Sequence, residues 1–425
     1  MNLLLKYTWK ELGYALILVL ILQGNLFIKL FFISILLICN LDKVLSKSIN
    51  KSAFFYFYIL ATIIISVLTI GWLHRFNYIF SLAFSFLIWF FCLFLFNYNS
   101  EQIKRNTVTS IRNVLEIIFW VNVFFSFGQL VLLMIEQRNL NPFGGTHKAS
   151  TGDFIYGIFS NSSVNMIIST FFFFYYYNER KFLKSILAGV VAVLTTYMGG
   201  LILAIGAFLI ILVLSPAIKF KYKIFGVLLL VAAYFAFQFV SPENMRYVEN
   251  NIKMTLSKRP PRKVISFVET YKHGTSNVPR FLFGSGPGNF SSRTAFVLGG
   301  EYVSWLPEKF IYRSPDFSAN HFQLWNKKVL AIPYNDGTAN QPFSLYNQLF
   351  GEYGIIGLFM FVIFYLGYYI KKYYSLTYGK YILIFMLLIF IMDYWFEYLS
   401  VVVLFEFFML LQTKELNEES KLVQA

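Results

Sequence analysis

Residues 78–96 read YIFSLAFSFLIWFFCLFLF, without a charge, a proline or a glycine. A helix of this length crosses a bilayer, because a membrane span needs about 20 apolar residues. Similar stretches lie at 12–23, 25–39, 53–73, 114–135, 164–177, 185–198, 200–215, 224–240, 345–370, 379–392 and 398–411. The sequence therefore predicts an all-α polytopic membrane protein with about twelve transmembrane helices.

The composition excludes several other classes of protein. Of the 425 residues, 57% are hydrophobic and only 13% are charged, against roughly 25% charged in a soluble domain. Cys39 and Cys92 both lie in apolar runs, which argues against a disulfide scaffold. The chain has four histidines and no CxxC or HExxH pattern, so we expect no metal and no cofactor.

The net charge of +15 is explained by the excess of Lys and Arg in the cytoplasmic loops of membrane proteins. We therefore do not expect nucleic acid as a partner. Basic residues gather in the segments that face the cytoplasm if the N-terminus is inside, such as Lys104, Arg105 and Arg112. The short outer loops hold Arg75, Arg138 and Lys148. We therefore expect both termini in the cytoplasm, and a first helix that is retained because no cleavage site follows it.

The chain divides into three regions: spans 1–9 in residues 1–240 with an outer loop at 136–163, a large extracytoplasmic loop at 241–344, and the last three spans with a tail at 345–425. The large loop carries thirteen Lys and Arg but seven Asp and Glu. Ser241-Pro242-Glu243 predicts a helix start, and Pro260-Pro261 ends that helix before a second one near Arg262. No internal repeat is evident, which weakens an inverted-repeat transporter.

The second helix of this loop places Arg262, Ser266, Glu269 and His273 on one face. That face is either solvated above the membrane or lines a cleft. The next motif, FLFGSGPGNF at 281–290, has three alternating glycines, Gly284, Gly286 and Gly288, followed by Asn289. Such a turn can bring backbone N–H groups close to a phosphate or a sugar.

The loop closes with LYNQLFGEYGIIGL at 345–358, which places Glu352 near the outer interface. Together with FLFGSGPGNF, this sequence resembles the signature of the O-antigen polymerases and ligases. The stretch from Thr151 to Ser163 is similar to an outer-loop motif of the same family. The ligase branch typically has a His-Asn pair where this chain has Phe343 and Ser344, which favours a polymerase.

The resemblance implies a GT-C-like membrane glycosyltransferase that works without a metal in the bacterial inner membrane. Its partners would be undecaprenyl-pyrophosphate-linked oligosaccharides, the lipid bilayer and a chain-length regulator. The product would be O-antigen or capsular polysaccharide. The reaction needs cations for the leaving pyrophosphate and a base for the attacking hydroxyl.

Several residues are candidates for these roles, all on the expected outer face. Arg280 is the first candidate for the pyrophosphate, because it directly precedes the glycine turn. Glu269 and His321 are the candidate bases, ahead of Asp316 and Asp336. The further candidate ligands of pyrophosphate or glycan are Arg262, Arg259, Lys263, Arg293, Arg313, Glu352, Asn289 and the three glycines, with Arg138, His147 and Lys148 in the other outer loop. Asp393 and Glu397 are candidates for contacts with acceptor sugars, and we expect Glu406 to pair within the bundle.

Two alternatives remain open at this point. An O-antigen ligase would use similar donor chemistry but would transfer the polymer to a lipid A core. A transporter or flippase would belong to a different class and would place ionisable residues along a central pathway. Polar residues of this sequence concentrate outside the spans, which favours the enzyme.

Overall fold

The computed structural model describes residues 7–40, 51–71, 76–140, 142–143, 154–214, 242–255, 257, 260–301, 306–330 and 341–424, with isolated positions between 220 and 238. Every regular element within these residues is a helix. The expectation of an all-helical chain is thus confirmed for the described part. The expected span at 224–240 lies largely outside it, as do Arg259, Lys148, His147 and Asp336.

The first half of the chain forms a series of mostly apolar helices. They are α1 (Trp9–Leu22), α2 (Leu26–Ile38), α4 (Ala53–Ser66) with η2 (Val67–Gly71), α5 (Phe76–Arg105), α6 (Val108–Gln137), α7 (Ser162–Asn178), α8 (Phe182–Leu194) and α9 (Met198–Leu214). Gln23, Gly24 and Asn25 separate α1 from α2, as expected from the sequence.

The second half forms a set of short helices followed by long ones. The short set is α11 (Pro242–Thr255), α12 (Arg262–Gly274), α13 (Val278–Phe283), α14 (Arg293–Leu298), η4 (Glu308–Phe310), α15 (Pro315–Ala319), η5 (His321–Leu324) and α16 (Lys327–Leu330). Then follow α17 (Leu345–Met360), η7 (Phe361–Leu366), α18 (Gly367–Lys371), η8 (Tyr373–Ser375), α19 (Tyr378–Ile389), η9 (Trp395–Glu397) and α20 (Leu399–Gln424).

Among the residues that the structure describes, three helical stretches are long and apolar enough to cross a membrane: Phe76–Arg105, Val108–Gln137 and Leu345–Lys371. Shorter apolar helices lie at Ile28–Ile38, Ala53–Thr69, Phe182–Leu194, Met198–Val213 and Tyr378–Ile389. A helix rises 1.5 Å per residue, so a 14-residue helix such as α1 is roughly 21 Å long. This is shorter than the ~30 Å hydrocarbon core. The chain is therefore a helical membrane protein, and its long spans are fewer than its apolar runs.

Helix α20 forms the centre of the bundle. Its residues 401–411 are all buried, as expected for a helix that is apolar on every side. Within it, Glu406 accepts hydrogen bonds from the hydroxyls of Tyr56 (2.5 Å) and Tyr365 (2.9 Å). Glu406 thus pairs inside the bundle, as expected.

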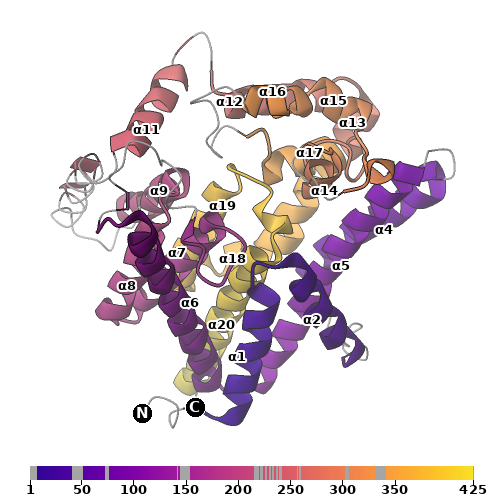
Figure 1. Ribbon diagram of the computed structural model, residues 1–425. Helices are drawn as coiled ribbons and strands as arrows, with labels where there is room; N and C mark the ends of the chain where they lie inside the picture. The colour runs from indigo at the N-terminus through magenta and orange to yellow at the C-terminus, as the bar shows by residue number, and fades with distance from the viewer. Residues whose placement is uncertain are drawn as a thin grey trace.

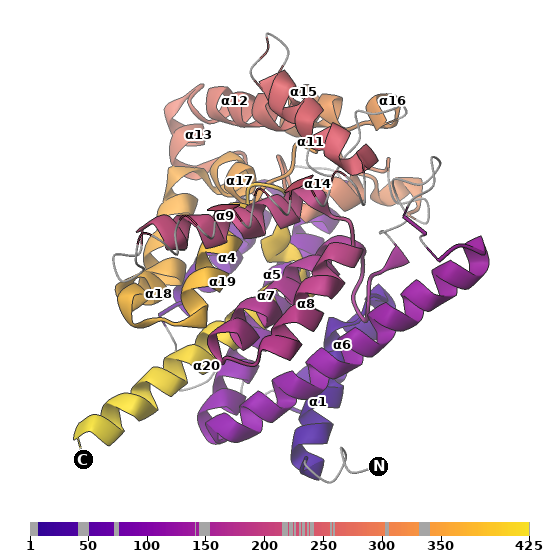
Figure 2. The same ribbon diagram turned by 90° about the vertical axis from the view of Figure 1, so that its left-hand side faces the viewer.

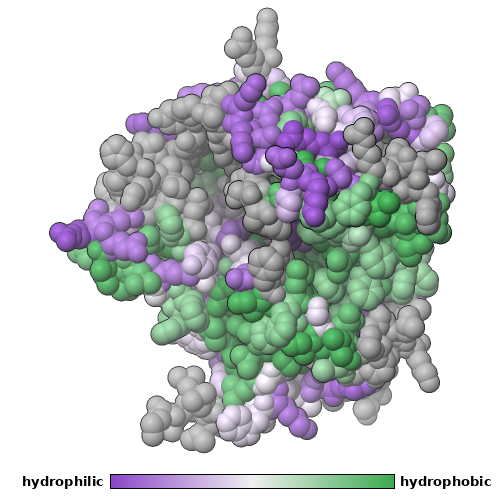
Figure 3. Space-filling view, turned by 45° about the vertical axis from the view of Figure 1, so that its right-hand side comes forward, coloured by the Kyte–Doolittle hydropathy of each residue, from purple (hydrophilic) through white to green (hydrophobic). Residues whose placement is uncertain are grey.

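The short helices form a cap over one end of the bundle. Figure 1 shows α12, α13, α15 and α16 lying across this end, while α1, α5, α6 and α20 run below them. The start of α1 and the end of α20 both lie at the opposite end (Figure 2). Figure 3 shows a broad hydrophobic band beneath the hydrophilic cap, the pattern expected of a bundle in lipid. We call residues 260–330 of this layer the cap.

Candidate functional site

The two sequence motifs of the resemblance lie against each other. Gly354 has φ 65° and ψ −165°, which breaks the helical path inside α17. Two carbonyl groups of α17 next to this break accept hydrogen bonds from the glycine turn. The Ser285 N–H donates to the Gly351 carbonyl (2.8 Å), and the Gly286 N–H donates to the Glu352 carbonyl (3.0 Å). A Cβ atom at Gly354 would lie 2.4 Å from the backbone of Leu282. Glycine is therefore required where the two backbones meet.

The carboxylate of Glu352 organises the rest of the turn. Its side chain is buried, and it accepts N–H groups from Gly288 (2.8 Å), Phe290 (3.0 Å), Ser291 (3.0 Å) and Ser292 (3.0 Å). Charge-assisted hydrogen bonds of this number compensate for the burial of a carboxylate. The position of Glu352 was expected to be functional, and its observed contacts are with the chain's own backbone.

The N–H groups of the three glycines all have partners within the chain. The N–H groups of the turn were expected to face a phosphate. Instead, Gly284 donates to the carbonyl of Arg280 (2.8 Å), Gly286 to the carbonyl of Glu352 and Gly288 to the Glu352 carboxylate. Because each of these N–H groups already has a partner, the turn positions neighbouring side chains and does not itself offer an anion site.

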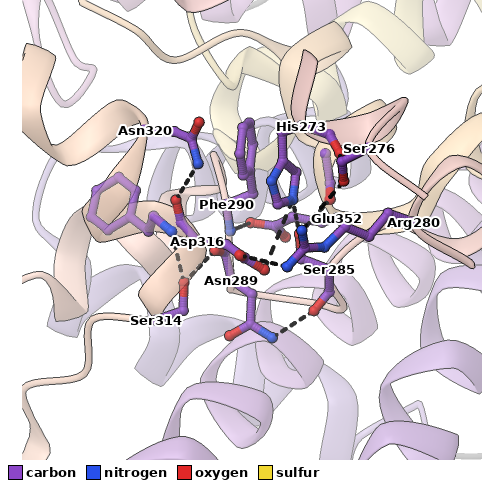
Figure 4. A network of polar contacts seen from close by, with 12 residues as sticks. His273, Ser276, Arg280, Ser285, Asn289, Phe290, Ser314, Asp316, Asn320 and Glu352 are labelled. Atoms are coloured by element: carbon purple, nitrogen blue, oxygen red, sulfur yellow. Dashed lines mark hydrogen bonds and ion pairs between the residues drawn. The ribbon is translucent and has the colours of Figure 1, made fainter. Parts of the chain in front are cut away.

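Next to this turn, side chains from α12, α13 and α15 form a polar cluster (Figure 4). The Nε2 atom of His273 lies 2.7 Å from Ser285 Oγ and 3.8 Å from Asp316 Oδ2. Arg280 forms an ion pair with Asp316 Oδ1 (3.0 Å) and donates to Ser276 Oγ (3.3 Å). The side chains of Arg280 and Asp316 are 37% and 26% exposed. The cluster therefore presents a charged pair to the surface above a buried histidine.

The geometry excludes a Ser-His-Asp relay in this cluster. Such a relay needs the carboxylate and the hydroxyl on different ring nitrogens, whereas Ser285 and Asp316 both approach Nε2 of His273. Burial lowers the pKa of His273, although Asp316 opposes this shift and Arg280 reinforces it. The ring also stacks on Phe290, with centroids 4.7 Å apart. His273 is consequently a neutral, fixed imidazole near pH 7.

The buried face of α12 includes two of the four residues that the sequence placed on one face, Ser266 and His273. Lys263, Ser266, Thr270 and His273 are its buried side chains. Arg262 and Glu269 flank this face; Arg262 donates to the carbonyl of Leu324 (3.0 Å). Burial raises the pKa of Glu269, and its Oε2 atom has no partner among the described residues. The polar face is thus packed into the protein, and Glu269 lies at its edge.

His321 lies inside the cap, away from solvent. Its Nδ1 atom is 3.0 Å from Ser291 Oγ, and its Nε2 atom is 3.1 Å from Thr270 Oγ1 and from the carbonyl oxygen of Ser266. Burial lowers the pKa of His321 to about 3. The expected base is therefore a neutral, fully enclosed ring that connects η5 to α12, and an incoming hydroxyl does not reach it in this structure.

Two other candidates hold the cap together. Lys263 donates to the carbonyls of Phe343 (2.6 Å) and Met392 (2.7 Å). Burial lowers its pKa, while the nearby Asp393 carboxylate raises it. Asn289 accepts from the hydroxyl of Tyr312 (3.0 Å), and its amide nitrogen donates to the Ser285 carbonyl (2.9 Å). Both residues thus have partners within the protein.

The remaining cations lie apart from the Arg280 cluster. Arg313 pairs with Glu301 (2.9 Å) and lies over the ring of Phe322. Arg138 is exposed at the end of α6. Arg293 begins α14 and lies over the ring of Tyr398. The structure thus brings Arg280 to Asp316 and His273 but does not bring the basic residues of the described part of the loop to one point.

Sequence reasoning missed Ser285 and Ser276 as members of the cluster. Ser285 stands between Gly284 and Gly286 in the glycine motif, where only the glycines were considered. Ser276 lies four residues before Arg280, the spacing of side chains on neighbouring turns. The described residues contain no group of three or more His, Cys, Asp or Glu side chains that could hold a metal ion.

Comparison with known proteins gives no relative for this chain: no family model, no curated protein and no solved structure matches it. The site is therefore interpreted from its own geometry.

Proposed function

We propose that this protein is a glycosyltransferase of the O-antigen polymerase type. It would transfer a glycan from undecaprenyl pyrophosphate to a hydroxyl of a second lipid-linked repeat unit, on the outer face of a bacterial cytoplasmic membrane. The supporting observation is that the glycine turn and α17 interlock and thereby hold Arg280 beside Asp316 and His273 at the surface of the cap. A chain-length regulator is a further partner in this proposal.

Arg280 is the residue that would bind the leaving group. The bond between the anomeric carbon and the phosphate oxygen breaks, and its electron pair moves onto the pyrophosphate. A guanidinium group matches phosphate oxygens in a forked geometry and stabilises that developing charge. Because Arg280 is paired with Asp316 before substrate arrives, the pyrophosphate competes with this carboxylate for the guanidinium.

Asp316 would then act as the base. Once the pyrophosphate occupies Arg280, the Asp316 carboxylate is available to accept the proton of the acceptor hydroxyl. The hydroxyl oxygen forms the new bond to the anomeric carbon in the same step. Glu269 is the second candidate for this role, because one of its oxygens has no partner in the described part of the chain.

Replacing Arg280 tests this assignment. In proteoliposomes with a lipid-linked repeat unit, Arg280→Ala should lower kcat by about 10²–10³-fold, the range measured for loss of a single transition-state hydrogen-bond donor. Arg280→Lys keeps the charge but loses the forked pair of N–H donors, so its activity should lie between those of wild type and Arg280→Ala. The control is Arg105→Ala, which removes an exposed arginine paired with Glu101 at the other end of the bundle.

The product separates the proposal from its rivals. Chains that lengthen on lipid-linked repeats support a polymerase, whereas transfer to a lipid A core without chain growth identifies a ligase. If Arg280→Ala makes polymer of normal length at a normal rate and expresses normally, the site assignment is wrong.

A further inference from the structure

Lys29 is a buried lysine whose amino group has no carboxylate partner among the described residues. Its side chain is 7% exposed, and Nζ donates to Ser400 Oγ (3.0 Å). The Ser400 hydroxyl in turn donates to the carbonyl of Leu22 (2.7 Å), so the end of α1 meets the start of α20 here. Among the described residues, no carboxylate lies within ion-pair distance of Lys29.

Arg293 is a half-buried basic residue near enough to Lys29 for their charges to repel each other. Its guanidinium lies 4.7 Å from the ring centroid of Tyr398 and donates to the backbone carbonyl of Glu397 (2.9 Å). The Glu397 carboxyl accepts a hydrogen bond from the backbone N–H of Arg293 but forms no ion pair with the Arg293 guanidinium. Burial raises the pKa of Glu397 to about 8, so this carboxyl is mostly protonated at pH 7, and the Asp393 carboxylate, whose pKa Arg293 lowers, is shared with Lys263.

Several described arginines, in contrast, lie beside a carboxylate. Arg280 pairs with Asp316, Arg313 with Glu301 and Arg112 with Glu415. Taking a charge out of water is unfavourable unless an opposite charge compensates for it, and two like charges make the cost greater. An anion that contacts both groups would supply the missing charge.

The surroundings of Lys29 favour an anion with a hydrocarbon tail. Helix α2 buries Lys29 and Ile33, whereas Ile28, Phe31, Ile35 and Ile38 are 41%, 60%, 41% and 69% exposed. Residues at this spacing form one stripe along the helix. In a membrane protein such a stripe faces acyl chains. A charged head at Lys29 would therefore lie beside a surface that suits the tail of the same molecule.

We propose that Lys29 and Arg293 together bind the phosphate group of a membrane lipid, at a site separate from the Arg280–Asp316 pair. Arg293 contributes guanidinium N–H groups, of which one is used by the Glu397 carbonyl, and Lys29 contributes its remaining ammonium N–H groups. The lipid is either a polyprenyl phosphate or an anionic glycerophospholipid, which share this head chemistry. The proposal is independent of turnover, because it concerns binding alone.

Direct lipid binding tests the proposal on the full chain. The purified protein in neutral detergent is titrated with undecaprenyl phosphate, phosphatidylglycerol and phosphatidylcholine, and bound lipid is measured by native mass spectrometry. We expect tighter binding of at least one of the first two lipids than of phosphatidylcholine. Lys29→Met and Arg293→Gln should each weaken that binding at least tenfold, as expected for loss of a charge-assisted contact. Lys309→Gln is the matched control, because Lys309 is an exposed cation of the same cap, and its affinity should stay within twofold.

Two further measurements keep the test decisive. The melting temperature of each variant shows whether it is folded. Arg293→Lys retains the charge but not the forked donors, so its affinity should lie between those of wild type and Arg293→Gln. Binding of undecaprenyl phosphate alone identifies the polyprenyl lipid, and binding of phosphatidylglycerol alone identifies a phospholipid. The proposal is wrong if the folded wild-type protein binds both no better than phosphatidylcholine, or if folded Lys29→Met and Arg293→Gln bind like wild type. An inactive Arg280→Ala that still binds lipid separates this site from the proposed reaction.

Discussion

At the residue scale, the geometry of the candidate site depends on one glycine and one carboxylate. The non-helical conformation of Gly354 leaves two carbonyls of α17 free to accept hydrogen bonds from the glycine turn. The Glu352 carboxylate accepts hydrogen bonds from the N–H groups of that turn. The sequence identified both motifs but not this contact between them. The reason is physical: a Gly-rich turn and a buried carboxylate each have several possible partners, and the packing of the backbones selects among them.

Replacement of Gly354 by alanine should destabilise the protein. The backbone angles there belong to a region that only glycine occupies readily, and the added Cβ would meet the backbone of Leu282 at 2.4 Å. We expect a loss of about 2–4 kcal/mol, seen as a lower melting temperature in detergent. Gly13→Ala is the control, because nothing lies within 4 Å of its added Cβ and alanine favours a helix. Equal melting temperatures for the two variants would contradict the observed kink.

At the element scale, α12 shows what helical spacing predicts and what it leaves open. The spacing correctly grouped Ser266 and His273, and α12 begins at Arg262 as expected. It did not show that Lys263 and Thr270 complete the buried face in place of Arg262 and Glu269. Periodicity gives the angle between side chains, whereas the neighbours of the helix decide which direction is inward.

The contact between η5 and α12 should make the stability of the cap depend on pH. The pKa of His321 is about 3 in the fold and about 6.5 in an unfolded chain. The unfolded state therefore binds more protons below pH 6.5, so stability is present above this pH and falls as the pH is lowered. Each pH unit between the two values removes about 1.4 kcal/mol.

Melting curves at pH 7.5, 6.5 and 5.5 check this expectation. Wild-type protein should lose stability below pH 6.5, and His321→Gln should lose less over the same interval. His273 has a lowered pKa and remains in the variant, so the slope should decrease without vanishing. Identical slopes would show that His321 titrates normally and is not enclosed.

At the scale of the whole molecule, hydropathy predicted the class of protein better than the number of its long spans. The starts of α4, α17 and α20 lie within a residue of the expected spans. Several apolar runs, however, form helices of 10–17 residues. Composition reports which segments avoid water, but a run buried against other helices and a run that crosses lipid have the same composition.

The position of the two ends predicts a labelling pattern. If the cap lies outside and the end of α20 lies inside, a membrane-impermeant maleimide should label Tyr271→Cys in intact cells, because Tyr271 is 66% exposed on the cap. Ser420 is exposed near the end of α20, so Ser420→Cys should be labelled only after the cells are permeabilised. The background is Cys39→Ser, since Cys39 is the exposed native thiol and Cys92 is buried. Labelling of both sites from the same side would refute the proposed topology.

Because the glycine turn depends on Glu352, the cap can complete its assembly only after α17 has been synthesised. The ribosome synthesises Gly288 64 residues before Glu352, so the turn is translated before its acceptor exists. The segment must therefore wait, unassembled, until the translocon has received the helix that carries Glu352. In a chain arrested before that helix, these four amides would lack their carboxylate acceptor and the cap would stay open to membrane proteases.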